Sequence, residues 1–120
     1  MERRTGWQKP ADSGLELRVL TALRRRGIEL VQQHAVVLGD RSVIHLDGAD
    51  PEIRWGVEID HVTWHGGRLD AQRDKARDRA ARLVGWQIER VTDHDVADDM
   101  AGTIDELVRL HELRRTAVAV

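Results

Sequence analysis

The feature that most constrains the fold is a change of hydrophobic period midway along the chain. Residues 53–61 are apolar at alternate places and bounded by turns, which is typical of a strand. Residues 68–84 then repeat apolar side chains at helical spacing, and residues 86–91 alternate again. Two strands of one sheet that are joined through a helix have to run parallel. The sequence therefore predicts an α/β fold.

The segments before this crossover supply the remaining strands. A capping box at 13–16 and a stop at Gly27 predict a first helix over residues 13–26. Residues 30–38 and 42–46 are rich in apolar and β-branched side chains and flank a turn signal, so we expect a hairpin. We expect Asp47 to close the second strand of this hairpin, and residues 48–52 to form the next turn because they contain Gly, Asp and Pro.

The two ends of the chain complete the outline. A second capping box begins at Thr103 and predicts a last helix, with Leu107, Leu110 and Leu113 in the core. Residues 1–12 lack apolar periodicity and are expected to form a flexible arm, which leaves residues 13–120 as a single domain. The expected order is helix, three strands, helix, strand, helix. This is an α/β three-layer core with a mixed four-stranded sheet flanked by helices, in the order αβββαβα.

Composition narrows the function. The chain has 120 residues, of which 41% are hydrophobic, enough for one modest core. There is no cysteine, so a metal would be held by carboxylates, imidazoles or carbonyl oxygens, which favours a hard cation such as Mg²⁺ or Mn²⁺. Apolar residues never run long enough to span a bilayer, so we expect a cytoplasmic protein with no membrane partner.

Charge argues against a strong overall attraction to nucleic acid, because 19 basic residues stand against 21 acidic ones. Binding to DNA would then depend on a local cluster. The candidate residues lie in or next to the helix at 68–84, where the alternative is a solvated helix face; they are Arg68, Arg73, Lys75 and Arg77.

Three acids carry the strongest functional signal. Side chains alternate along a strand, so Glu58 and Asp60 point to the same face, and Asp47 on the neighbouring strand can lie beside them. Converging carboxylates repel each other unless a cation lies between them, so the pattern indicates a metal site. The alternative is an amphipathic strand with two acids on its solvent face.

The spacing of these acids resembles a known family. The chain contains, in order, Asp47, a Pro-Glu turn at 51–52, Glu58-x-Asp60 and a Trp-His pair at 64–65. This order resembles that of short endonuclease-like proteins related to the very-short-patch-repair (Vsr) mismatch endonuclease. That group is a branch of the PD-(D/E)XK nuclease superfamily. The resemblance continues through the helix and last strand, at Gln72, Asp74, Arg77-Asp78, Gly85-Trp86 and the segment 90–92.

The resemblance implies a restriction-endonuclease-like fold and a metal-dependent DNA endonuclease or nickase, acting as a monomer or a homodimer. Asp47, Glu58 and Asp60 would bind Mg²⁺ or Mn²⁺, and Glu16 is a further candidate ligand that the capping box also explains. His65 would accept a proton from the attacking water, with a structural turn residue as its alternative.

Gln72 is the last candidate site residue: it would hold phosphate oxygens, with a structural hydrogen bond to the strand backbone as the alternative. Two positions depart from the pattern. Asp60 takes the place of the superfamily lysine, and His61 stands where the group has glycine. The alternative function is therefore a catalytically inactive nuclease-fold module that binds DNA or regulates a partner.

Overall fold

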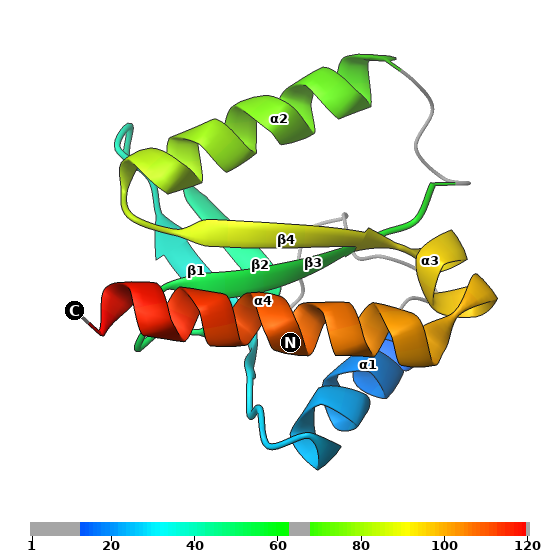
Figure 1. The fold of residues 1–120 in the computed structure, drawn as a ribbon. Coiled ribbons are helices and arrows are strands. Elements are labelled where there is room, and N and C mark those ends of the chain that lie inside the picture. The colour runs from blue at the N-terminus through cyan, green and yellow to red at the C-terminus, as the bar shows by residue number, and fades with distance from the viewer. Residues whose placement is uncertain (1–12, 63–67, 120) are drawn as a thin grey trace, which may run out of the picture.

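The computed structural model describes residues 13–62 and 68–119, which form a sheet with helices on both faces (Figure 1). The sheet order is β1-β2-β3-β4. This confirms the expected three-layer α/β core and mixed sheet, with one additional helix. In chain order the elements are α1 (Ser13–Arg25), β1 (Val31–Val37), β2 (Val43–Asp50), β3 (Trp55–Asp60), α2 (Arg68–Leu83), β4 (Gln87–Thr92), α3 (Asp93–Asp98) and α4 (Met100–Val118).

Strand directions follow from the connections. Short turns join β1 to β2 and β2 to β3, and both pairs are antiparallel. The connection through α2 makes β3 and β4 parallel, in register from Trp55 beside Gln87 to Asp60 beside Thr92. The predicted crossover is confirmed, and its helix ends at Leu83, shortly before Gly85 adopts a φ of 91°.

The core is divided between the two faces of the sheet. On one face, α1 and α4 pack against the apolar side chains of β3 and β4 around Trp55, Val57 and Ile59. On the other face, α2 contributes Ala81 to a smaller cluster with Leu46 and residues from β1 and the end of the crossover. Figure 1 shows α2 alone above the sheet, and α1 and α4 below it. The face under α2 is therefore the less apolar one.

The second strand is longer than expected. Asp47 lies within β2 and does not end it, and the following turn spans residues 51–54. Gly48 is a packing residue, because a Cβ there would lie 2.7 Å from the side chain of Leu20 on α1. The glycine allows close approach of the helix and is not a turn signal.

The end of the chain begins its last helix earlier than expected. Asp99 caps α4 by accepting a hydrogen bond from the Gly102 N–H, so the prediction of a start near Thr103 is wrong. Thr103 is buried and donates to the Asp95 carbonyl instead. A true capping box at Thr92 opens the additional short helix α3. Leu107 is in the core as expected, whereas Leu113 is 67% exposed.

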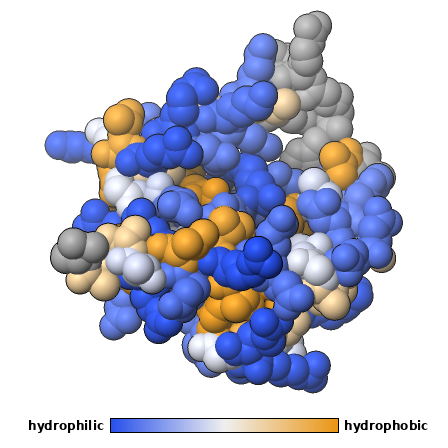
Figure 2. Space-filling view, viewed as in Figure 1, coloured by the Kyte–Doolittle hydropathy of each residue, from blue (hydrophilic) through white to orange (hydrophobic). Residues whose placement is uncertain are grey.

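The crossover helix turns an unexpected face to the sheet. Periodicity predicts a buried face made of Leu69, Gln72, Ala76, Ala80, Leu83 and Val84. Ala80 and Val84 are half-buried against the cluster around Ala81, but Gln72 and Ala76 are exposed and Leu83 is 88% exposed. The side chain of Leu69 lies outside the described residues. The half-buried positions of α2 include Asp74, Arg77 and Asp78, which are charged. The outer surface of α2 is mostly hydrophilic (Figure 2). Ion pairs described below explain the difference.

One arginine of α4 connects two loops. Arg114 Nε donates to the carbonyl of Ile53 at 2.8 Å, and its Nη2 donates to the carbonyl of Gly85 at 2.8 Å. The loops that precede β3 and β4 are thereby held to the same side chain. Among the described residues, no helix combines the length and the apolar character needed to cross a bilayer.

Candidate functional site

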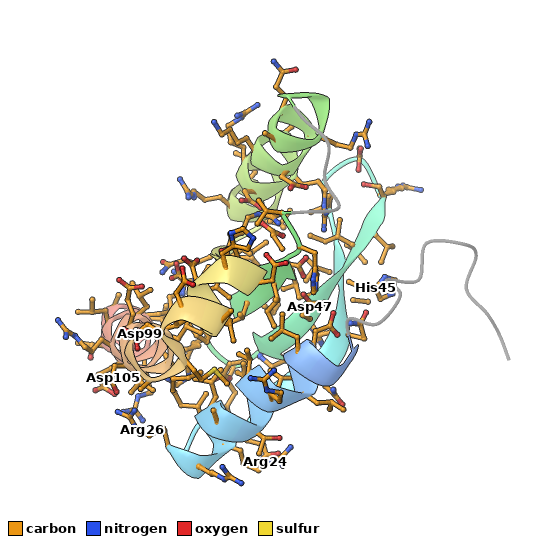
Figure 3. All side chains as sticks on the ribbon, turned by 90° about the vertical axis from the view of Figure 1, so that its right-hand side faces the viewer. Arg24, Arg26, His45, Asp47, Asp99 and Asp105 are labelled. Carbon is orange, nitrogen blue, oxygen red and sulfur yellow. The ribbon has the colours of Figure 1, made fainter. Side chains whose placement is uncertain are left out.

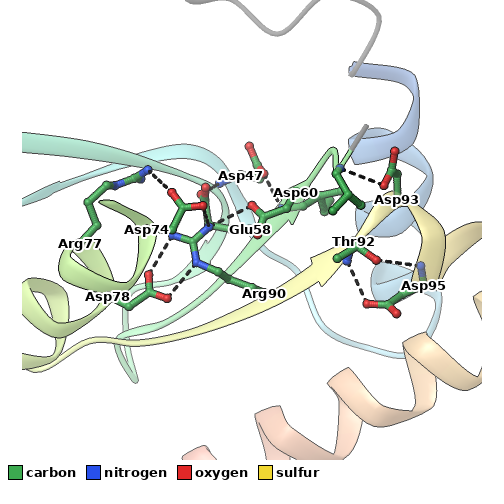
Figure 4. Close-up of polar contacts among 12 residues, drawn as sticks. Asp47, Glu58, Asp60, Asp74, Arg77, Asp78, Arg90, Thr92, Asp93 and Asp95 are labelled. Carbon is green, nitrogen blue, oxygen red and sulfur yellow. Dashed lines mark hydrogen bonds and ion pairs between the residues drawn. The ribbon is translucent and has the colours of Figure 1, made fainter. Parts of the chain in front are cut away.

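Two buried carboxylates from neighbouring strands form the centre of the candidate site. Asp47 on β2 is 2% exposed and Glu58 on β3 is 6% exposed. The backbone N–H of Asp47 donates to Glu58 Oε2 at 2.8 Å, and the N–H of Ile59 donates to Asp47 Oδ2 at 2.8 Å. These reciprocal bonds hold the side chains of Asp47 and Glu58 next to each other (Figure 4). Each carboxylate exchanges part of its hydration for a backbone donor, which makes its burial possible.

These two acids line a cavity of about 350 Å³ that Arg77 of α2 also lines. Four elements supply its walls, and the lining residues are Gln33, Val43, Ile44, His45, Asp47, Glu58 and Arg77. Figure 3 shows His45 and Asp47 close together on β2. The cavity combines carboxylates with an imidazole, an amide and a guanidinium, a set of groups suited to a polar, charged ligand.

Arg77 brings a positive charge to this cavity from α2. Its nearest carboxylate is Asp74, with 3.8 Å between Arg77 Nη1 and Asp74 Oδ1. The buried Nε of Arg77 has no hydrogen-bond partner among the residues that the structure describes. A buried N–H donor without an acceptor is costly, so this atom is suited to receive a ligand oxygen.

Asp60 lies on the same face as Glu58, as the alternation predicts, but the structure places it beside Arg90. Arg90 Nη1 donates to Asp60 Oδ1 at 2.9 Å, and its Nε and Nη2 both bind Asp78, each at 2.8 Å (Figure 4). Asp74 lies 3.9 Å away. The structure therefore brings together Asp47 and Glu58, and assigns Asp60 to an ion-pair network between β3, β4 and α2.

The environment of Arg90 accounts for its charge. Burial opposes the protonated form, but the hydrogen bond to Asp78 and the charges of Asp60, Asp78 and Asp74 outweigh it, so the pKa of Arg90 is raised above its ordinary value. The half-buried charged residues of α2 all belong to this network: Asp74 and Asp78 face Arg90, and Arg77 pairs with Asp74. Because charged positions face the sheet, Gln72, Ala76 and Leu83 remain exposed, while Ala81 still joins the apolar cluster.

The other expected site residues are spread more widely. Glu16 is buried on α1. Gln72, Arg73 and Lys75 are exposed on α2 and do not line the cavity. His65 and the side chain of Arg68 lie outside the described residues. Within residues 13–62 and 68–119, no group of three or more acidic or histidine side chains is close enough together to bind one metal ion.

Three residues of this region were missed by the sequence interpretation. Gln33 and His45 line the cavity, and Arg90 organises the acids beside it. His45 had a detectable signal, since it precedes Asp47 by two places on one strand and such residues share a face. Arg90 had a weaker one, because it is a single arginine in a strand that follows a helix rich in aspartate.

Comparison of the chain with protein-family models, with curated proteins and with solved structures gave no match. What bears on function is then the geometry of Asp47, Glu58 and Arg77 around the cavity, together with the motifs that resemble the Vsr-related nucleases.

Proposed function

We propose that this protein is a metal-dependent nuclease that hydrolyses phosphodiester bonds in DNA. The observation that carries the proposal is the pair of buried carboxylates, Asp47 and Glu58, held side by side at a cavity that also contains Arg77. Negative groups can bind a cation and a positive group can bind a phosphate, and both stabilise the transition state of phosphodiester hydrolysis.

The two carboxylates fit a hard divalent cation. Mg²⁺ is usually bound by one or two carboxylates and completes its coordination with water and substrate phosphate oxygens. Asp47 and Glu58 are oxygen donors, and one oxygen of each is fixed by a backbone N–H. Mg²⁺ or Mn²⁺ held by this pair would polarise the phosphate and lower the pKa of a bound water.

The remaining residues have supporting parts in this proposal. Arg77 would bind a phosphate oxygen through its guanidinium, and the exposed Arg73 and Lys75, with Arg68 at the start of α2, would contact the DNA backbone. His65 stays the proposed proton acceptor. Asp60 would act indirectly, because its ion pair with Arg90 helps to fix α2, the helix that carries Arg77.

A supercoiled-plasmid nicking assay with Mg²⁺ or Mn²⁺ tests the proposal. Asp47→Asn and Glu58→Gln should each lower the nicking rate by about a hundredfold or more, because each removes a charge that would bind the cation. Asp98→Asn and Glu106→Gln change exposed acids on α3 and α4 and should nick at the wild-type rate. Equal rates for Asp47→Asn and Asp98→Asn would contradict the proposal.

One observation favours a second candidate, the inactive DNA-binding or regulatory module. Arg90 engages Asp60, so this carboxylate is drawn away from the site that the resemblance assigns to it. If the purified wild-type protein retards DNA in a gel without nicking it at any concentration of Mg²⁺ or Mn²⁺, the binding module is the better description.

A further inference from the structure

Strand β1 contains an unusual backbone conformation at Gln33. Its φ is 50°, in the left-handed region that non-glycine residues rarely adopt. The other two non-glycine residues with positive φ among those described, Arg41 and Arg54, lie in turns, where such values are common. Pairing with β2 continues on both sides, at Gln32 and His34, so the irregularity is confined to the residue opposite Asp47.

The conformation directs the Gln33 amide to the candidate site. Gln33 Nε2 donates to Asp47 Oδ1 at 3.3 Å, while the backbone N–H of Ile59 donates to Asp47 Oδ2 at 2.8 Å. Donors from β1 and β3 thus act on the two oxygens of one carboxylate on β2. Together they fix the plane of the Asp47 carboxylate, which neither bond fixes alone.

Packing does not explain why the chain accepts this strain. The Gln33 side chain is exposed and belongs to neither apolar cluster. Gln33 also lines the same cavity as Glu58 and Arg77. Strained residues persist where their surroundings require them, and they concentrate at functional sites. The requirement visible here is the contact with Asp47.

We propose that Gln33 is a positioning residue for the metal site, orienting the Asp47 carboxylate toward a divalent cation of the Mg²⁺ and Mn²⁺ class. This inference rests on the proposed function. Carboxylates that bind metals are usually held by hydrogen-bond partners, and loss of such a partner typically lowers metal affinity by about 10-fold to 100-fold. Gln33 would act through Asp47, without touching the substrate.

The test compares Gln33→Gly with Gln32→Gly in the whole chain, by calorimetric titration with Mn²⁺ and by thermal unfolding. Glycine adopts positive φ without strain, so Gln33→Gly should raise the melting temperature while weakening Mn²⁺ binding by about tenfold. Gln32 is an exposed neighbour with no positive φ, so Gln32→Gly should lower the melting temperature and leave Mn²⁺ affinity unchanged. A purely structural role for Gln33 cannot produce opposite changes in stability and affinity.

A further variant and three results decide the inference. Gln33→Asn tolerates the left-handed backbone but is one methylene shorter, so it should also lose Mn²⁺ affinity. Wild-type affinity in Gln33→Gly would overturn the positioning role and leave the proposed function intact. An equal loss of affinity in Gln32→Gly would also overturn it, since the cause would be a loosened β1. Absence of Mn²⁺ binding by the wild type would overturn the proposed function and this inference together.

Discussion

The two faces of β3 differ sharply although they belong to the same six residues. Trp55, Val57 and Ile59 point to α1 and α4 and are essentially fully buried. Glu58 and Asp60 point the other way, toward α2, where Glu58 lines the cavity and Asp60 binds Arg90. One strand therefore provides both the apolar core and the polar site, which fixes the acids on a rigid element.

The helices that cover these faces are held differently. α1 and α4 pack through apolar side chains, whose burial is favourable at roughly 25 cal/mol per Å². α2 is held by a small cluster around Ala81 and by the ion pairs of Arg90 with Asp60 and Asp78. Ion pairs away from water gain little net stability because of desolvation. The polar face thus contributes less to stability and provides the groups for chemistry.

The largest effect is expected on the apolar face. Trp55→Ala removes a fully buried side chain and the hydrogen bond from its Nε1 to Glu89, so the free energy of unfolding should fall by about 4 kcal/mol. Urea unfolding measures this change. Leu83→Ala, at an exposed position on α2, is the control and should change stability little. A small loss for Trp55→Ala would show that this face does not dominate stability.

Removing the charge at the centre of the polar face should have the next largest effect. Arg90→Met keeps much of the side-chain length but removes the positive charge that faces Asp60, Asp74 and Asp78, at a cost of about 3 kcal/mol in urea unfolding. An unchanged or increased stability would mean that the cluster around Ala81 alone holds α2.

The pH dependence sharpens the same experiment. The pKa of Arg90 is raised by folding, so its contribution to stability is fully present below the ordinary arginine pKa and is lost only as the pH rises through the raised value. Arg90 stays protonated from about pH 6 to about pH 9. The difference in unfolding free energy between wild type and Arg90→Met should therefore be constant over this range. A difference that shrinks across this range would indicate another titrating group.

The pair of His111 and Asp50 lies on the otherwise apolar face of the sheet and tests whether polar groups contribute to stability there. His111 on α4 is buried, its Nε2 lies 2.8 Å from Asp50 Oδ2, and its ring meets Trp55 edge to face. His111→Ala would leave Asp50 without this partner and should lower the free energy of unfolding by about 2 kcal/mol. His94→Ala, at an exposed histidine on α3, provides the reference in the same urea experiment. Matching values for the two variants would show that the pair contributes nothing.

The smallest effects should come from two glycines that face opposite sides of the sheet. A Cβ at Gly48 would meet Leu20 at 2.7 Å, and one at Gly56 would meet Leu46 at 2.5 Å. Each alanine variant should lose about 1 to 2 kcal/mol of unfolding free energy, because a leucine side chain has to move. Gly39→Ala, where nothing lies within 4 Å, is the control. A much larger loss at Gly48 would show that the apolar face is the more rigidly packed of the two.

Local patterns predicted the parts of the fold that depend on local chemistry. The first helix ends where expected, with Gly27 at a φ of 89°, and the crossover helix forces the parallel pair. Tertiary contacts decided the rest. Gly48 resembles a turn residue in the sequence, but α1 packs against it. The apolar residues of α2 recur at helical spacing, but charged positions of the helix face the sheet, where Asp78 pairs with Arg90.

The candidate site divides in the same way. Strand alternation is sufficient to place Glu58 and Asp60 on one face, but it cannot show that Arg90 engages one of them. Gln33 could not be found from sequence, because its contact with Asp47 depends on a single backbone angle. Residues that act through geometry leave little trace in composition or period.

The two loop carbonyls bound by Arg114 have a consequence for the order in which the protein forms during translation. Arg114 follows Gly85 by 29 residues and Ile53 by 61. On the ribosome, the loops before β3 and β4 leave the exit tunnel well before Arg114, whose side chain binds them. The antiparallel strands can begin to pair earlier, but the loops before β3 and β4 can be joined by Arg114 only after α4 has been synthesised.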